Sequence, residues 1–228
     1  MRILGHRGAR REAPENTLAG IERALAAGAD GVEVDVRRTA DGRLVVIHDA
    51  TVARTTDGRG SVARMSFDTL RGLDAGDGER VPSLEEVVLA VRGRGELFVE
   101  VKDPGCAVDA ARLVARTGDV RECLVKCFDH RPLAAVRAAA PGLRTGCLLV
   151  GRPADPVTLA RVAGADVLSL DHAWLDADLV DACHSAGVAV CAWTCNAPRA
   201  ARRLRSIGVD WLVTDVPSRL VPVLRDRV

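Results

Sequence analysis

The chain has 228 residues, enough for one large domain or two small ones, and nearly half of them are apolar. Its 32 lysines and arginines almost balance 31 aspartates and glutamates, so the net charge of +1 provides no basic surface for nucleic acid and no polybasic run for a membrane. Tyrosine is absent and only three phenylalanines and three tryptophans occur, so we expect no aromatic platforms for stacking single-stranded nucleic acid.

Strand-like and helix-like segments follow one another along the chain. Eight strands are predicted, at Arg2–His6, Val32–Val36, Leu97–Lys102, Leu124–Phe128, Arg144–Val150, Val167–Asp171, Val188–Thr194 and Trp211–Asp215. Eight helices are predicted, at Thr17–Ala27, Leu84–Val91, Val108–Arg116, Pro132–Ala140, Pro156–Val162, Asp178–Ala186, Pro198–Ile207 and Ser218–Arg225. Eight strand–helix units in a chain of this length, without a break in composition, predict a single α/β domain over residues 1–228, a (β/α)₈ TIM barrel.

The segment around the second strand carries the clearest signal of a site. Its strict alternation places Glu33 and Asp35 together on one face and the intervening valines on the other. Asp41-Gly42 predicts a two-residue hairpin turn, and Leu44–Ile47 is the returning strand. This register sets His48 opposite Asp35, about 5 Å away at Cβ. The pattern therefore predicts that two carboxylates and an imidazole meet in one place.

One interval interrupts the alternation of strands and helices. Asp49–Pro82 is long, polar and rich in glycine, and it directly follows His48. It is interpreted either as a lid or substrate-contacting insertion after the second strand, or as a solvated loop that binds nothing.

Ionisable residues gather at the C-terminal ends of the predicted strands, where TIM barrels hold their active sites. His6 and Arg7 end the first strand, and Glu100 and Lys102 share the inward face of the third. One charged pair inside a barrel is readily explained as a structural ion pair. Charged residues at the same end of three strands favour a site instead.

The carboxylates Glu33, Asp35 and Glu100 offer only oxygen ligands, which favours Mg²⁺ or Ca²⁺ over zinc. Arg7, as a bidentate fork, and Lys102, as a point charge, then make the pocket positive enough for an anion.

His6 and His48 titrate near neutrality, so one histidine can accept a proton while the other donates one. Together with the cation and anion sites, this pair predicts displacement at a phosphodiester.

The chain resembles the glycerophosphodiester phosphodiesterase family over nearly its whole length. The matching motifs are, in order, His6-Arg7-Gly8, Pro14-Glu15-Asn16-Thr17, Glu33-Val34-Asp35-Val36, His48-Asp49, Arg54-Thr55-Thr56-x-Gly58-x-Gly60, Val81-Pro82-Ser83-Leu84-Glu85-Glu86-Val87, Glu100-Val101-Lys102, Trp193-Thr194-x-Asn196 and Thr214-Asp215-x-Pro217. The first motif alone is weak, whereas nine ordered matches are specific. Departures such as Cys127-Phe128, where Ser-Phe is common, leave the charged residues intact.

The resemblance implies a role for each of these side chains. It implies that a divalent cation is held by Glu33, Asp35 and Glu100, and that the acid–base pair is His6 and His48. It implies further that the phosphate and the metal are bound or oriented by Arg7, Glu15 and Lys102, and that Trp193 lines the glycerol end. The implied reaction cleaves a glycerophosphodiester to sn-glycerol 3-phosphate and an alcohol.

Several choices stay open. The attacking group is water or the substrate's own 2-hydroxyl, the latter through a cyclic phosphate. The sequence does not show which histidine is the acid and which is the base, or whether the cation is Mg²⁺ or Ca²⁺. It also leaves the head-group preference and the oligomeric state undecided. Asp215 is interpreted as a helix cap rather than a partner of a catalytic group, Asn16 as a helix start, and His130 and His184 as surface or structural histidines.

Two rival functions are a phospholipase D-like phosphodiesterase of the sphingomyelinase type and a catalytically silent barrel that binds phosphorylated ligands. The first would use a similar histidine pair, but the Lys102 and Trp193 motifs argue against it. The second predicts the loss of a charged site residue, and none is missing.

The start of the chain and its cysteines predict a cytoplasmic protein. The chain opens into a strand-like segment without a signal-peptide region or about 18 consecutive apolar residues. Its seven cysteines include no Cys-x-x-Cys pair, although Cys123/Cys127 and Cys191/Cys195 repeat a wider spacing. We expect reduced, buried cysteines, with a zinc site as the alternative.

Overall fold

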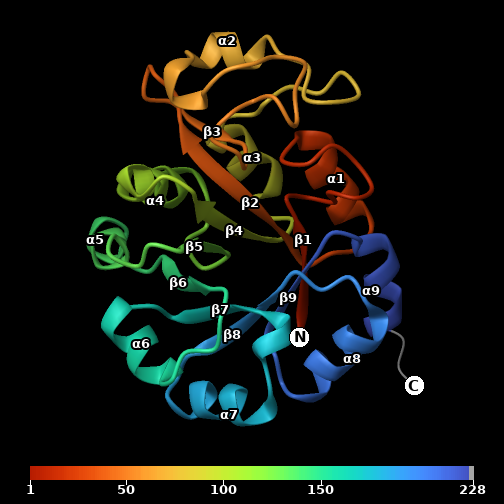
Figure 1. Ribbon diagram of the computed structural model, residues 1–228, viewed down its shortest axis with the longest axis vertical. Coiled ribbons are helices and arrows are strands. Elements are labelled where there is room, and N and C mark those ends of the chain that lie inside the picture. Colours follow the sequence, from red (N-terminus) through yellow and green to blue (C-terminus); the bar gives the residue numbers. More distant parts are fainter. Residues whose placement is uncertain (226–228) are drawn as a thin grey trace.

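The alternation of apolar strands and capped helices produces a closed barrel of eight parallel strands in the described part of the chain (Figure 1). The structure, a computed structural model, describes residues 1–225. The parallel strands are β1 (Arg2–His6), β2 (Gly31–Arg38), β4 (Glu96–Val101), β5 (Cys123–Cys127), β6 (Arg144–Leu149), β7 (Val167–Asp171), β8 (Ala189–Trp193) and β9 (Trp211–Thr214). Pairing of β1 with both β2 and β9 closes the ring, which confirms the predicted TIM barrel.

Helices cover the outside of the barrel close to where they were predicted. They are α1 (Leu18–Ala26), α3 (Leu84–Val91), α4 (Ala107–Thr117), α5 (Leu133–Ala139), α6 (Pro156–Ala163), α7 (Ala177–Ser185), α8 (Pro198–Ser206) and α9 (Pro217–Arg225). Side-chain caps fix the starts of some of them: Ser83 and Glu86 form a capping box on α3, and Asp155 caps α6. Within residues 1–225, no helix combines the length and the apolar character needed to cross a membrane.

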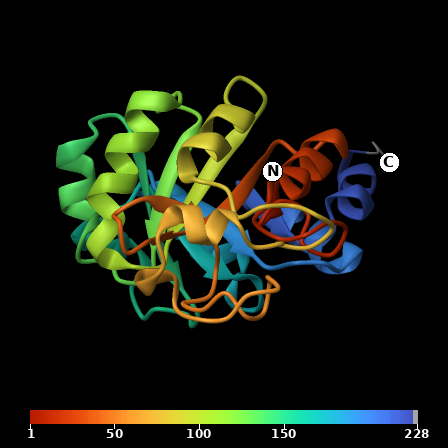
Figure 2. The same ribbon diagram turned by 90° about the horizontal axis from the view of Figure 1, so that it is seen from above.

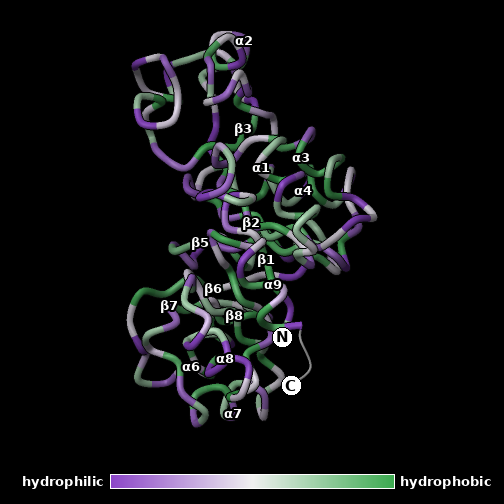
Figure 3. The backbone as a smooth tube through the Cα atoms, turned by 90° about the vertical axis from the view of Figure 1, so that its right-hand side faces the viewer, coloured by the Kyte–Doolittle hydropathy of each residue, from purple (hydrophilic) through white to green (hydrophobic). Residues whose placement is uncertain are grey.

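Strand side chains alternate between two apolar layers. Val34 and Val99 point outward and pack against the helices, while Phe98 and Trp211 fill the barrel interior. Figure 3 shows the strands as mostly hydrophobic segments at the centre of the molecule. The seven cysteines are free and buried within these layers, as the sequence predicted.

The hairpin after β2 differs from its prediction by one residue in register. The returning strand β3 (Leu44–Val46) pairs antiparallel with β2, and beyond its end Ile47 N donates to Asp35 O at 2.9 Å. Ile47, and not His48, therefore lies opposite Asp35. The predicted direct pairing of His48 with Asp35 is wrong.

The cause is a loop of three residues instead of two. A two-residue type I′ turn needs a positive φ at both central positions, whereas only Gly42 has one here (φ +82°). Thr39 closes the loop, because its N–H donates to Arg43 O and its hydroxyl accepts from Arg43 N, both at 2.9 Å. Asp41 lies in the middle of this loop, and its carboxylate accepts from Phe67 N at 3.0 Å.

The interval 49–82 is a folded insertion. It contains the 3-10 turn η1 (Val62–Arg64) and the short helix α2 (Phe67–Arg71), neither of which was predicted. Its apolar side chains form one cluster with Val45 of β3 and Ile47 just beyond it, and the members from the insertion are Val52, Val62, Leu70, Ala75 and Val81. The insertion extends from one edge of the barrel in Figure 1, and Figure 2 shows it displaced toward one side. The insertion is therefore not an unstructured loop, because these apolar side chains pack together.

Gly31 provides a test of the strand packing. A Cβ atom at Gly31 would overlap the backbone of Glu96 on β4, so we expect Gly31→Ala to lower the free energy of unfolding by about 1–3 kcal/mol. Urea denaturation measures this change. Gly151→Ala is the matched control, since a Cβ there meets nothing within 4 Å, and it should change stability by less than about 0.5 kcal/mol. Equal stabilities of the two variants would contradict the close strand packing.

Candidate active site

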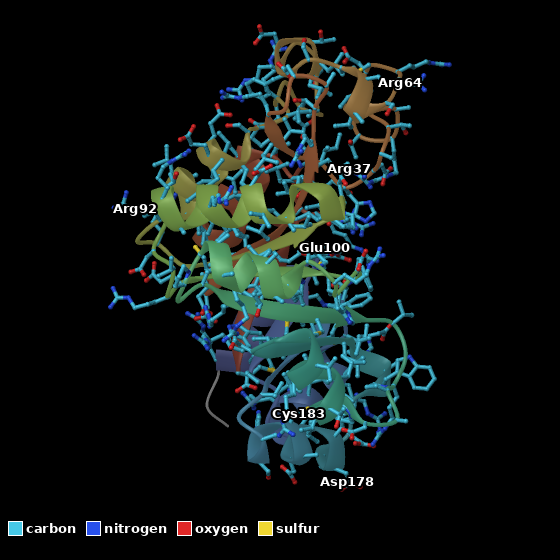
Figure 4. All side chains as sticks on the ribbon, turned by 90° about the vertical axis from the view of Figure 1, so that its left-hand side faces the viewer. Arg37, Arg64, Arg92, Glu100, Asp178 and Cys183 are labelled. Carbon is cyan, nitrogen blue, oxygen red and sulfur yellow. The ribbon has the colours of Figure 1, made fainter. Side chains whose placement is uncertain are left out.

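Three carboxylates converge at the C-terminal end of the barrel interior. Glu33 and Asp35 project from β2, and Glu100 lies beside Asp35 in the register of β4. One oxygen from each lies within 4.8 Å of the others, and all three residues are buried. In Figure 4, Glu100 lies between the insertion, where Arg64 is labelled, and the lower half of the barrel. These are the three residues that the sequence predicted to meet.

Two positively charged side chains that the sequence predicted for the site lie against this cluster. Lys102 Nζ is 3.2 Å from Asp35 Oδ1 and donates to Glu100, and Arg7 Nε is 3.1 Å from Asp35 Oδ2. Burial alone would raise the pKa of Asp35, but the charges of Lys102 and Arg7 outweigh it and lower that pKa. The pKa of Glu100 is raised, first by burial and then by the neighbouring carboxylates.

Lys126 is a third cationic side chain at the cluster, and it was not among the predicted site residues. Its side chain projects inward from β5, and Nζ lies 3.3 Å from Glu33 Oε1. The one available signal was its place two residues after Leu124, on the inward face of an otherwise apolar strand. With Lys126, three cationic side chains balance three carboxylates inside the barrel.

The cluster fits a divalent cation. Glu33 Oε2 and Asp35 Oδ1 are buried and accept no hydrogen bond from the described residues. Buried oxygens that accept no hydrogen bond are costly even beside a charged group, and a hard cation that prefers oxygen ligands would satisfy both. The donor set therefore suits Mg²⁺ or Ca²⁺.

Asn16 directs Asp35 rather than merely starting a helix. Its side-chain amide donates to Asp35 Oδ2 at 3.0 Å and its oxygen accepts from Asp35 N at 3.2 Å. The cap of α1 is Thr17 instead, so the interpretation of Asn16 as a helix start alone was wrong. The backbone of Asn16 has φ +58°, a conformation that asparagine tolerates better than most residues.

Both predicted histidines line one cavity of about 300 Å³ above the carboxylates. His6 Nε2 lies 3.9 Å from Glu33 Oε2, while His6 Nδ1 is 2.6 Å from Asp215 Oδ1. His48 Nδ1 is 2.6 Å from Asp49 Oδ1, and burial lowers the pKa of His48. Each ring is thus held through Nδ1 by a carboxylate, an arrangement that fixes its orientation.

Asp215 orients His6, so its interpretation as a helix cap was wrong. Its second oxygen accepts from Asn196 Nδ2 at 2.7 Å, while Glu12 accepts from Ser218 at the start of α9. Burial would raise the pKa of Asp215, but the contacts with His6 and Asn196 lower it to about 2. The partners are 209 residues apart in sequence, which is why local pattern reasoning favoured the cap.

Glu15 belongs to a chain of ion pairs at the edge of the cavity. It accepts from Arg7 at 2.8 Å and from Arg54 at 2.8 and 2.9 Å, and Arg54 also donates to Asp49 at 2.6 Å. Arg54 of the insertion is therefore connected to Arg7 through Glu15, and to His48 through Asp49. Glu15 is outside the carboxylate cluster and contacts Arg7 instead.

Part of the cavity wall is apolar. The rings of Trp193 and Phe128 meet edge-on at 5.8 Å, and Leu148 lies beside them. Trp193 Nε1 is buried and donates no hydrogen bond to the described residues. The wall therefore offers one unused donor on an apolar surface, a combination suited to a hydroxyl on a small carbon skeleton.

Comparison with known proteins decides the family. Residues 6–219 match the profile described as the Glycerophosphoryl diester phosphodiesterase family. The chain belongs to this family. A glycerophosphodiester phosphodiesterase from Caldanaerobacter subterraneus subsp. tengcongensis is 34% identical, with 98% of this chain and 97% of that protein aligned. The predicted resemblance is therefore confirmed.

Solved structures show the same architecture. The phosphodiesterase of Oleispira antarctica in complex with the product sn-glycerol-3-phosphate has a TM-score of 0.92 and 26% identity, covering 99% of this chain and 97% of that one. The glycerophosphodiester phosphodiesterase of Agrobacterium tumefaciens strain C58 has a TM-score of 0.85 and 31% identity, covering 97% and 99%. The chain is thus an enzyme of the phosphodiester hydrolase class.

Asp215→Asn tests the buried pair with His6. The pKa of Asp215 in the folded state lies below the unfolded value, so the ionised form stabilises the fold above about pH 4 and loses this effect as the pH falls toward 2. We expect Asp215→Asn to cost on the order of 2 kcal/mol at pH 7, and the difference from wild type to shrink below pH 4. Urea unfolding across this range measures it, and a difference independent of pH would contradict the assignment.

Proposed function

We propose that this protein hydrolyses glycerophosphodiesters to sn-glycerol 3-phosphate and an alcohol, with a divalent cation at Glu33, Asp35 and Glu100. The observation that carries the proposal is the meeting of these buried carboxylates, with two unsatisfied oxygens, and two oriented imidazoles in one cavity. The product bound to the Oleispira antarctica relative supports glycerol 3-phosphate as the product.

Arg7 and Lys102 would bind the phosphate. Both line the cavity, and their positive charges would attract an anionic oxygen although Arg7 and Lys102 also face Asp35. Glu15 holds the guanidinium of Arg7 and thereby orients it. Trp193, with its unused Nε1 donor, would contact the glycerol hydroxyls.

His6 and His48 would perform the proton transfers. One removes the proton of the attacking hydroxyl or water, and the other protonates the leaving alkoxide. Asp215 and Asp49 keep the rings in place and stabilise the imidazolium form. When bound, the divalent cation supplies Lewis-acid stabilisation of the phosphate charge.

A cytoplasmic location stays a prediction. The seven free, buried cysteines support it, because such cysteines are typical of reducing compartments. Mg²⁺ and Ca²⁺ stay equivalent candidates for the cation.

His48→Ala and His6→Ala test the proton transfers. Because general acid–base catalysis contributes roughly 10²–10⁴-fold, we expect kcat for release of glycerol 3-phosphate from glycerophosphocholine to fall by that factor in each variant. His184→Ala is the matched control, since His184 lies on α7 and contacts Asp210 away from the cavity. Near-full turnover by His48→Ala would contradict its role. If the wild-type protein released choline from a lysophospholipid but did not cleave glycerophosphocholine, the phospholipase D-like alternative would be favoured.

The carboxylates are tested by cation titration. We expect a chelator to abolish activity, Mg²⁺ or Ca²⁺ to restore it, and either cation to raise the Tm of the wild-type protein. Glu100→Gln should raise the cation concentration needed for both effects at least about tenfold. Asp178→Asn, an exposed carboxylate on α7, is the control. Unchanged titration curves in Glu100→Gln would contradict its place among the ligands.

A further inference from the structure

Lysine is nearly excluded from this sequence. Among its 32 basic residues, Lys102 and Lys126 are the only lysines, and all the others are arginines. Both lysines lie against the carboxylate cluster. A lysine side chain thus occurs in this chain only where its ammonium group faces these carboxylates. Lysine and arginine are not interchangeable at such a position, because the ammonium group is a compact point charge and the guanidinium group is a planar fork.

Lys126 lies at the floor of the cluster. It is 1% exposed and paired with Glu100 in the β5–β4 register, and its Nζ lies 3.3 Å from Glu33 Oε1. Gly146 on the neighbouring strand makes room for its side chain, since a Cβ there would lie 3.2 Å from Lys126 Cβ. A buried ammonium is costly unless it is paired, and Glu33 is the one carboxylate within 4 Å of it among the described residues.

Glu33 is shared between Lys126 and the rest of the cluster. One of its oxygens faces Lys126 Nζ, and the other accepts no hydrogen bond from the described residues. The second oxygen is therefore available to a divalent cation while the first stays paired with the lysine. A cation at the cluster must accordingly bind beside a fixed positive charge.

We propose that Lys126 is a built-in counter-ion that lowers the affinity of the carboxylate cluster for a divalent cation and keeps the cluster stable when no cation is bound. The inference rests on the cation site of the proposed function. A unit charge about 6 Å from a dication lowers an association constant roughly tenfold even with the screening of bulk water, and more strongly in a buried site. Lys126 thus favours a loosely held, exchangeable cation over a permanent one.

Lys126→Met tests this inference by removing the charge at nearly constant volume. We expect Mg²⁺ and Ca²⁺, each titrated into the full chain without substrate, to bind the variant at least about tenfold more tightly in isothermal titration calorimetry. The cation-free variant should have a lower Tm than the wild type, and the increase in Tm on adding cation should be larger. Arg116→Gln, which removes one exposed positive charge on α4, should change none of these values.

The outcomes separate this inference from the proposed function. If the wild-type protein binds cation and Lys126→Met binds it no more tightly, the inference is wrong and the cation site stands. If wild type and variants all fail to bind, the cation site itself is wrong. Lys126→Gln, whose amide can still donate to Glu33, undergoes the same titration and decides the question should Lys126→Met not fold without cation.

Discussion

Mutual repulsion among Glu33, Asp35 and Glu100 is the constraint on which the rest of the site depends. Three carboxylates buried within 4.8 Å of one another have lost the screening of water and must be compensated by nearby cations. Lys102, Lys126 and Arg7 supply that compensation. The cluster is therefore close to neutral by itself and would become positive if a divalent cation joined it, which would suit a phosphodiester anion.

The two histidines depend on supports from different parts of the fold. Asp215, at the end of β9, holds His6, whereas Asp49 and Arg54, both in the insertion, hold His48. The apolar cluster that packs the insertion therefore also helps to fix His48, one of the two histidines proposed to transfer protons. Under the proposed function, the insertion would contribute to catalysis by holding His48 in place, without having to move.

The barrel and its charged interior could be predicted because both follow from local periodicity. Alternation along β2 and β4 determines which side chains face inward, and the ends of parallel strands meet at one face. The hairpin register could not be predicted, because Asp-Gly suits loops of two and of three residues and the choice depends on the Thr39 hydroxyl. Lys126 and Asp215 were missed or misread because their partners are distant in sequence.

Anomalous diffraction from crystals of the full chain soaked in Mn²⁺, a hard cation with a usable anomalous signal, tests the central claim most directly. The account predicts one strong difference peak within about 2.5 Å of oxygens from Glu33, Asp35 and Glu100, with Lys126 still paired to Glu33. A protein that binds Mn²⁺ elsewhere, or a cluster that stays free of it at saturating concentration, would contradict the claim.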